Sequence, residues 1–380
     1  SLLFSLCALV LHAQDSVKVR NWELKGYLGN MQSAMFQDVN QDWITDQLFH
    51  NRINFKWMPS ENFIFAAESR NRFMYGQMLQ LNPSYAITLD ADNGWMDLST
   101  NISEGKSYLL NASIDRLYAD YQSGSLQITL GRQRINWGQT FVWNPNDLFN
   151  TYSFFDFDYP EKPGSDALRV QYYTGAASSV EAVAKINHSS ESSYALLWKT
   201  NQWNTDFQVL AGIYEESDLT LGAGFSGAIG NLSLRGEGNY FTPKNHFADS
   251  GSTVVVSLGC DYTFSNSLTL QFESLYNQLP SGQALDSISN ILSIPFSSKK
   301  LSFTDYNIFG ALSYPLNPLL TGSLSAMYYP ELDGYYLGAD ISYSIRQDMD
   351  LTAFYQFFHL KLKMETGNFN LAALRLKWSF

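Results

Sequence analysis

Hydrophobic and polar residues alternate along most of this chain with a period of two, which is the period of a β-strand. Residues 334–345 show the pattern most clearly, because every second residue from Tyr335 to Ile345 is apolar or aromatic and most of the residues between them are Gly, Ser or Asp. Segments 219–227 and 254–262 alternate in the same way. Each segment therefore has one face suited to an apolar environment and one suited to water.

The alternating segments predict 18 strands. They cover residues 22–32, 45–58, 62–73, 109–122, 124–134, 166–175, 178–188, 192–201, 203–214, 218–229, 231–241, 252–265, 267–279, 301–315, 319–329, 334–346, 348–361 and 369–380. The pattern is ambiguous over 188–203, so 16 strands is the alternative.

The connections between these strands differ in length in a regular way. They are short after even-numbered strands, whereas those over 74–108, 135–165 and 280–300 are long. Short periplasmic turns and long outer loops are typical of transmembrane barrels. An even strand number also places both termini on the periplasmic side. We therefore expect an all-β fold, a transmembrane antiparallel up-and-down barrel.

The last predicted strand ends on an aromatic residue. Leu374, Leu376, Trp378 and Phe380 share its apolar face. This ending resembles the C-terminal sorting signal of bacterial outer-membrane barrels, and the resemblance implies that the assembly machinery recognises the Phe380 strand. The expected location is the outer membrane of a Gram-negative bacterium, in contact with lipid and lipopolysaccharide.

Composition supports a barrel over a helical membrane protein. Aromatic residues make up 15% of the chain and charged residues only 16%, whereas a soluble domain carries about 25% charged residues. Mean hydropathy is nevertheless slightly negative, at −0.19. Aromatic girdles are expected at both membrane interfaces. The inner girdle would contain Trp22, Trp57, Tyr121, Tyr172, Trp203, Tyr262, Tyr343 and Trp378, and the outer one Tyr240, Tyr276, Tyr328, Tyr335 and Phe357.

The first residues have the character of a secretory signal peptide. An apolar run from Ser1 ends at Ala13, before Gln14 and Asp15, and it is too short to span a bilayer as a helix. We expect a signal peptide over 1–13, truncated at its start, and a single barrel domain over 14–380.

Charge and motif content exclude several function classes. The net charge is −12, which argues against nucleic-acid binding. Without the signal peptide, Cys260 is the one cysteine, and the histidines His50, His188, His246 and His359 show no catalytic or metal-ligand spacing. No enzyme activity, cofactor or metal site is predicted.

A barrel of 16–18 strands leaves an aqueous lumen, and the polar faces of the strands would line it. Basic candidates are Lys25, Arg52, Lys56, Arg70, Arg72, Arg116, Arg169, Lys185, Lys199, Arg235, Arg375 and Lys377. Acidic candidates are Glu23, Glu68, Asp120, Glu181, Glu237, Asp261, Glu273 and Asp340. Such charges either select anionic solutes or pair across strands and hold the register. Arg52 with Lys56, and Arg70 with Arg72, are the stronger selectivity candidates, because few acidic neighbours are expected there.

One motif follows the fifth predicted strand. Gly131-Arg132-Gln133-Arg134 leads through Trp137-Gly138 to Trp143-Asn144-Pro145-Asn146-Asp147. This string resembles a group of porin-like barrels that includes the alginate-export-like proteins, and the resemblance implies an 18-stranded pore or a close relative, without implying alginate as the solute. The turn Asn144–Asp147 follows from its Pro and Asn residues.

The loop that carries this motif is too aromatic to remain free in water. Trp137, Phe141, Trp143, Phe149, Tyr152, Phe154, Phe155, Phe157 and Tyr159 all fall within 135–165. We expect the loop to fold inward and narrow the lumen, with Trp137, Trp143, Asn144 and Asp147 in the constriction. Lying over the outer rim is the alternative. Arg132 and Arg134 would stand at the loop's root, facing the pore. Their parity is that of lipid-facing Leu130, so we expect either a bulge near Gly131 or emergence of the strand above the membrane.

The sequence therefore predicts a channel for passive diffusion of small polar, and weakly preferred anionic, solutes. The alternative is a non-conducting partner barrel within an outer-membrane assembly or export complex. The oligomeric state is left open by the sequence.

Deletion of residues 141–160 tests the inward loop. If the loop narrows the lumen, the deletion raises single-channel conductance in planar bilayers. An unchanged conductance would favour a loop that lies on the outer rim.

Overall fold

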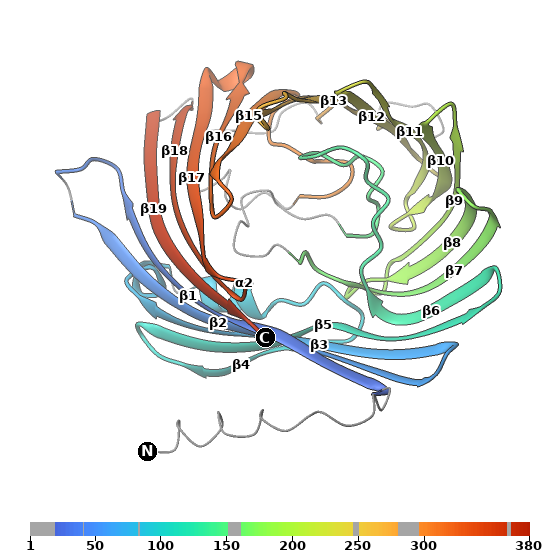
Figure 1. Ribbon diagram of the computed structural model, residues 1–380, viewed down its shortest axis with the longest axis horizontal. Coiled ribbons are helices and arrows are strands. Elements are labelled where there is room, and N and C mark those ends of the chain that lie inside the picture. Colours follow the sequence, from blue (N-terminus) through green and yellow to red (C-terminus); the bar gives the residue numbers. More distant parts are fainter. Residues whose placement is uncertain are drawn as a thin grey trace.

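The chain forms a single antiparallel sheet that closes into a barrel (Figure 1). The computed structural model describes residues 20–40, 42–82, 84–150, 161–245, 251–279, 296–362 and 366–380. The expected signal peptide over 1–13 lies outside these residues and stays a prediction.

The strands follow one another around the barrel in chain order, apart from the short β4. They are β1 (Trp22–Phe36), β2 (Ile44–Ser60), β3 (Phe63–Gly76), β4 (Ser99–Glu104), β5 (Tyr108–Ser123), β6 (Leu126–Gln133), β7 (Ser165–Gly175), β8 (Ser178–Ile186), β9 (Ser192–Gln202), β10 (Thr205–Tyr214), β11 (Asp218–Ile229), β12 (Leu232–Pro243), β13 (Thr253–Thr263), β14 (Thr269–Asn277), β15 (Tyr306–Asn317), β16 (Leu320–Tyr329), β17 (Gly334–Arg346), β18 (Met349–Lys361) and β19 (Thr366–Ser379).

Eighteen of these strands form the closed ring, because β3 pairs directly with β5 and bypasses β4. This confirms the predicted antiparallel barrel and its strand number. The ambiguous region contains the strand β9, so the 16-strand alternative is wrong.

The predicted loop 74–108 is more ordered than the sequence indicated. It contains α1 (Met78–Leu81), α2 (Tyr85–Asp90) and β4. The remaining short helix, the 3-10 turn η1 (Pro330–Leu332), lies between β16 and β17. Among the described residues, no helix combines the length and apolar character needed to cross a bilayer.

The ring closes where the last strand meets the first. Tyr27 lies opposite Ser379, and the register continues to Phe36 and Asn370. Gly26 and Phe380 exchange two backbone hydrogen bonds, each of 2.9 Å. Phe380, half exposed on the outside of the barrel, thus takes part in closure, while its recognition by the assembly machinery stays a prediction.

Large apolar side chains point outward around the whole ring. Leu28, Leu130, Leu221 and Ile341 are examples, each about half exposed. All eight residues of the predicted inner girdle are exposed, as are Tyr328 and Tyr335 of the outer one. The alternation predicted from the sequence therefore separates an apolar outer surface from a mostly polar inner one.

The strand β6, with 8 residues, is much shorter than its neighbour β5, with 16, and pairs only with the part of β5 from Leu117 to Ser123. Above the end of β6, the free edge of β5 pairs with β4 (Ser113 with Ser99), and Gly94 forms an isolated bridge to Asn187 at the end of β8. Residues 91–98, which we term the cover segment, thus continue the wall in place of the missing strand ends.

Arg132 fastens the cover segment to the strands. Its guanidinium group donates to Asp166 on β7, at 2.8 and 2.9 Å, to Asp92 at 2.5 Å, and to the carbonyl oxygen of Met96. The preceding Gly131 has a φ of 115°, a conformation that favours glycine. The pairing of β6 with β5 and with β7 nevertheless continues through Gly131 without a register shift, so the expected bulge is wrong.

Replacement of Arg132 by Met should destabilise the barrel. Asp166, which is only 7% exposed, would lose its cation, and leaving a buried charge unpaired costs about 3–5 kcal/mol. Urea unfolding in detergent measures the change. The double variant R132M/D166N should recover part of the loss, because it leaves fewer buried charges unpaired. An R132M protein as stable as the parent would contradict this role.

Candidate functional site

The loop that follows β6 lies inside the barrel (Figure 1). Its described residues 134–150 contact the inner faces of strands from β8 to β14. The hypothesis of an inward fold is therefore confirmed over this part, and the rim alternative is wrong. Tyr152, Phe154, Phe155, Phe157 and Tyr159 lie outside the described residues.

Trp137 anchors the beginning of the loop. Its side chain is 1% exposed, and its indole Nε1 donates to Glu181 Oε1 on β8 at 2.6 Å. The Gln208 side chain on β10 donates to the Trp137 carbonyl oxygen at 2.8 Å. Phe149 packs edge-on against the indole ring at 4.9 Å, so both ends of the described segment meet at this point.

Two buried carboxylates on the wall hold the middle of the loop. Glu273 on β14 accepts from the backbone N–H groups of Phe141, Val142 and Trp143, at 2.8, 3.0 and 2.8 Å. Glu273 and the second carboxylate, Glu237, are at most 2% exposed. Successive backbone N–H groups that converge on one carboxylate satisfy a charge that burial would otherwise penalise.

Glu237 on β12 is the second anchor. It accepts from the backbone N–H groups of Gln139, Thr140 and Asn146, the last two at 2.7 and 3.0 Å, and from the Thr140 hydroxyl at 3.0 Å. Together, Glu237 and Glu273 form what we term the carboxylate anchors.

The predicted turn Asn144–Asp147 lies against the wall. Asp147 N donates to the Asn144 carbonyl oxygen at 3.1 Å, and Asn146 Nδ2 donates to the Ala223 carbonyl oxygen on β11 at 2.9 Å. Burial raises the pKa of the Asp147 carboxyl to about 6, although Lys162 and Arg134 oppose the rise. Trp143, 2% exposed, packs in the same apolar cluster as Trp137 and Phe149.

The returning end of the loop reaches the other side of the barrel. Arg116 on β5 donates to the carbonyl oxygens of Glu161 and Lys162 at 2.9 and 2.7 Å. Arg134 donates to the Glu161 carbonyl oxygen at 3.4 Å. Lys185 on β8 donates to the Phe149 carbonyl oxygen at 3.1 Å. These three cations, expected to line the pore, thus also hold the loop backbone.

Other predicted lining residues form ion pairs across the wall. Arg169 binds both oxygens of Glu181 at 2.8 Å, and Arg235 binds Asp261 at 2.7 Å while it stacks over Phe141. These contacts match the register-holding interpretation.

Arg52 corrects one expectation. It is 1% exposed and pairs with Glu68 at 2.6 Å and with Asp115. The expectation that Arg52 has few acidic neighbours is therefore wrong. Asp115 is an extra residue in β5, where the β3 register shifts between Glu68 and Ser69, and this bulge brings its carboxylate to Arg52.

The inner wall beyond the anchored segment carries the remaining candidates. Arg72 donates to Asn111 at 2.8 Å, Arg70 is buried on the same strand, and Lys56 lies opposite Glu23. Arg375 on β19 and Asp340 on β17 are partly exposed. Among the residues that the structure describes, Arg375 forms no ion pair, and Lys377 lies 4.5 Å above the Tyr27 ring.

The sequence did not indicate which acids would bind the loop. Glu181 and Glu273 were expected only to face the lumen, and the apolar inner patch beneath the loop was missed. Its members include Leu197, Leu210, Val255 and Leu275, all at most 2% exposed. The available signal was a run of apolar residues on both strand faces, as in 195–198 and 254–256, which indicates that something covers the inner face.

Comparisons with known proteins support the fold. No protein-family model and no curated protein matches the sequence. Among solved structures, Acinetobacter baumannii OccAB3 is similar with a TM-score of 0.59 at 12% identity, covering 95% of this chain and 99% of that one. OccAB4 of the same organism has a TM-score of 0.57 at 10% identity, covering 95% of this chain and 98% of that one. The outer membrane protein OprD from Pseudomonas aeruginosa has a TM-score of 0.57 at 11% identity, covering 95% of this chain and 94% of that one. This likeness supports a porin-like barrel and not membership of the alginate-export-like group.

Replacement of Glu273 by Gln should loosen the loop. An amide oxygen accepts less strongly than a carboxylate, and hydrogen bonds to charged groups contribute about 1.5–3 kcal/mol each. We expect higher and more variable single-channel conductance, and an additive effect in E237Q/E273Q. The matched control is D340N, which removes one carboxylate from the inner wall away from the anchored segment. Equal conductance in E273Q and D340N would contradict the anchor role.

Proposed function

We propose that this protein is an outer-membrane channel for passive diffusion of small polar solutes, narrowed by its inward loop. An 18-strand ring is too wide for the side chains of its own strands to fill. The observation that carries the proposal is the contrast between two parts of the inner wall. From β8 to β14 the wall is covered by the loop, while polar side chains such as Asp340 and Arg375 face inward and keep partial exposure to solvent.

The fold supports the proposed location in the outer membrane. OprD, an outer membrane protein, and the Occ structures share this barrel over almost the whole chain. The apolar outer surface with its aromatic girdles is what such a barrel presents to lipid. The same likeness supports a role in transport over catalysis. The resemblance of the string Gly131–Asn150 to the porin-like group that includes the alginate-export-like barrels supports an 18-stranded pore and no particular solute.

Charge on the inner wall supports a preference for anions. Arg52, Arg169 and Arg235 are neutralised by carboxylates, so they contribute little to the field in the lumen. Arg375 and Lys377, on the inner face of β19, have no carboxylate within ion-pair distance among the described residues. Cations without an acidic partner attract anions into a narrow aqueous pore.

Reversal potentials across a planar bilayer under a salt gradient test this proposal. The parent channel should be weakly anion-selective, and R375Q should shift the reversal potential toward that of a cation channel. The control is K25Q, which removes an equal charge from a lysine that is paired with Glu23. This variant should shift the reversal potential less than R375Q does. A clearly cation-selective parent would contradict the anion preference. A folded protein without conductance would favour a partner barrel.

A further inference from the structure

The outer surface of the barrel is not uniformly apolar. On β1, β2 and β3, side-chain amides share the outward face with exposed apolar residues. Asn51 alternates in step with Phe49 and Ile53, and Asn71 with Phe73 and Tyr75. We term this set the amide face, which consists of Asn30, Gln32, Gln47, Asn51 and Asn71.

The amide face lies at the depth of the apolar band. Asn51 stands six positions along β2 from Trp57 of the inner girdle, and Asn71 stands four positions before the exposed Tyr75. At about 3.3 Å per residue on a tilted strand, both fall within the band of about 25 Å that barrels present to lipid. At comparable positions β11 presents Leu221 and Phe225.

The side chains of Asn51 and Asn71 are hydrogen-bonded to each other, but other donor and acceptor groups of the amide face are not used. Asn71 Nδ2 donates to Asn51 Oδ1 at 2.9 Å. Among the described residues, this is the one hydrogen bond of either side chain, so the Asn51 nitrogen and the Asn71 oxygen keep unused capacity. The Asn30 nitrogen, which is buried, also makes no hydrogen bond among these residues. Acyl chains cannot satisfy these groups.

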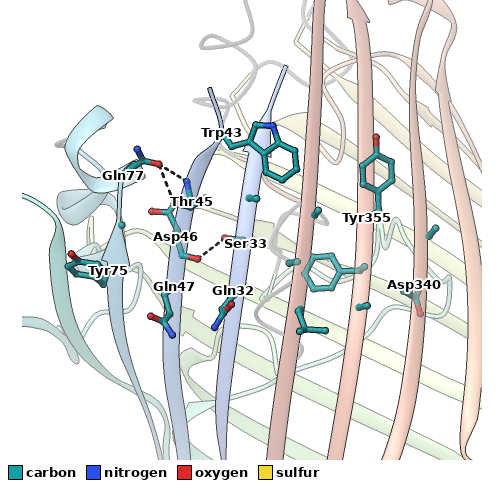
Figure 2. Close-up of a pocket in the computed structure, with 18 of the residues that line it drawn as sticks. Gln32, Ser33, Trp43, Thr45, Asp46, Gln47, Tyr75, Gln77, Asp340 and Tyr355 are labelled. Carbon is teal, nitrogen blue, oxygen red and sulfur yellow. Dashed lines mark hydrogen bonds between the residues drawn. The ribbon is translucent and has the colours of Figure 1, made fainter. Parts of the chain in front are cut away.

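A groove of about 1100 Å³ adjoins the amide face (Figure 2). Gln32, Thr45 and Gln47 line one side, and Tyr355 of β18 lines the other. Its further lining includes Ala339, Ile341, Ala353, Ala372 and Leu374. Exposure of Ile341, Leu374 and Tyr355 identifies it as a groove on the outside of the barrel.

We propose that the amide face and its groove form the contact with a second copy of this chain, related by a two-fold axis. The Asn51–Asn71 pair offers one unused donor group and one unused acceptor, and a two-fold axis brings the donor of each copy to the acceptor of the other. The outward residues of β1 to β3 include no charged side chain. A neutral amide surface is therefore complementary to itself rather than to a charged partner. The inference rests on the proposed outer-membrane location.

Cysteine cross-linking in isolated outer membranes tests this contact. Asn30→Cys, Asn51→Cys and Asn71→Cys are made singly in a C260S background and treated with an oxidant or a short bismaleimide. At least one of the three should give an adduct of twice the monomer mass. The control is L221C in the same background, at an outward position of β11 that is 59% exposed, which should remain monomeric.

The outcomes separate the two proposals. Protein that reaches the outer membrane but gives no dimer at any of the three positions overturns the contact alone. An adduct with a different protein overturns the second copy as the occupant. Absence from the outer-membrane fraction contradicts the proposed function and removes the basis of this inference.

A second variant tests the amides without cross-linking. N51L/N71L keeps the outer surface apolar and should lower the dimer fraction in mild detergent, measured by light scattering, without lowering the unfolding temperature. A dimer fraction equal to that of the parent would show that these amides do not hold the copies together.

Discussion

The architecture depends on one constraint, which is that every backbone N–H and C=O group inside a bilayer must find its partner within the protein. Pairing of β19 with β1 meets this constraint around the ring and leaves no free sheet edge. Beyond the end of the short β6, the edge of β5 would be exposed, and β4 pairs with it there instead. Arg132 joins this patch to the strands, so closure extends to the irregular side of the wall.

Closure at this width creates a second problem inside the ring, because strand side chains alone do not fill it. The loop after β6 covers the inner apolar patch, and the carboxylate anchors hold its backbone. Each buried carboxylate accepts several N–H groups, which offsets the cost of removing its charge from water. The loop thereby divides the inner wall into a packed part and a polar part that carries Arg375 and Asp340.

Period-two alternation was sufficient to predict the barrel, its strand number and its outward residues, because one-sided exposure to lipid imposes that pattern on every strand. The inward loop followed from the aromatic content of 135–165. The contacts of this loop could not be predicted, because Glu237 and Glu273 occupy the alternating positions expected of any lumen-facing acid. The Arg52 pairing also escaped prediction, because it depends on a bulge at Asp115 that no local signal marks. Alternation identifies the face of a side chain but not its partner across the lumen.

The anchors recognise the loop mainly through its main chain. Six backbone N–H groups, those of residues 139–143 and 146, bind the two carboxylates, and Thr140 adds its hydroxyl. A main-chain amide is present whichever residue bears it, proline excepted. Loop side chains that do not pack on the wall can therefore be exchanged without loss of docking. This makes the segment a replaceable insert, through which pore lining could be redesigned on an unchanged scaffold.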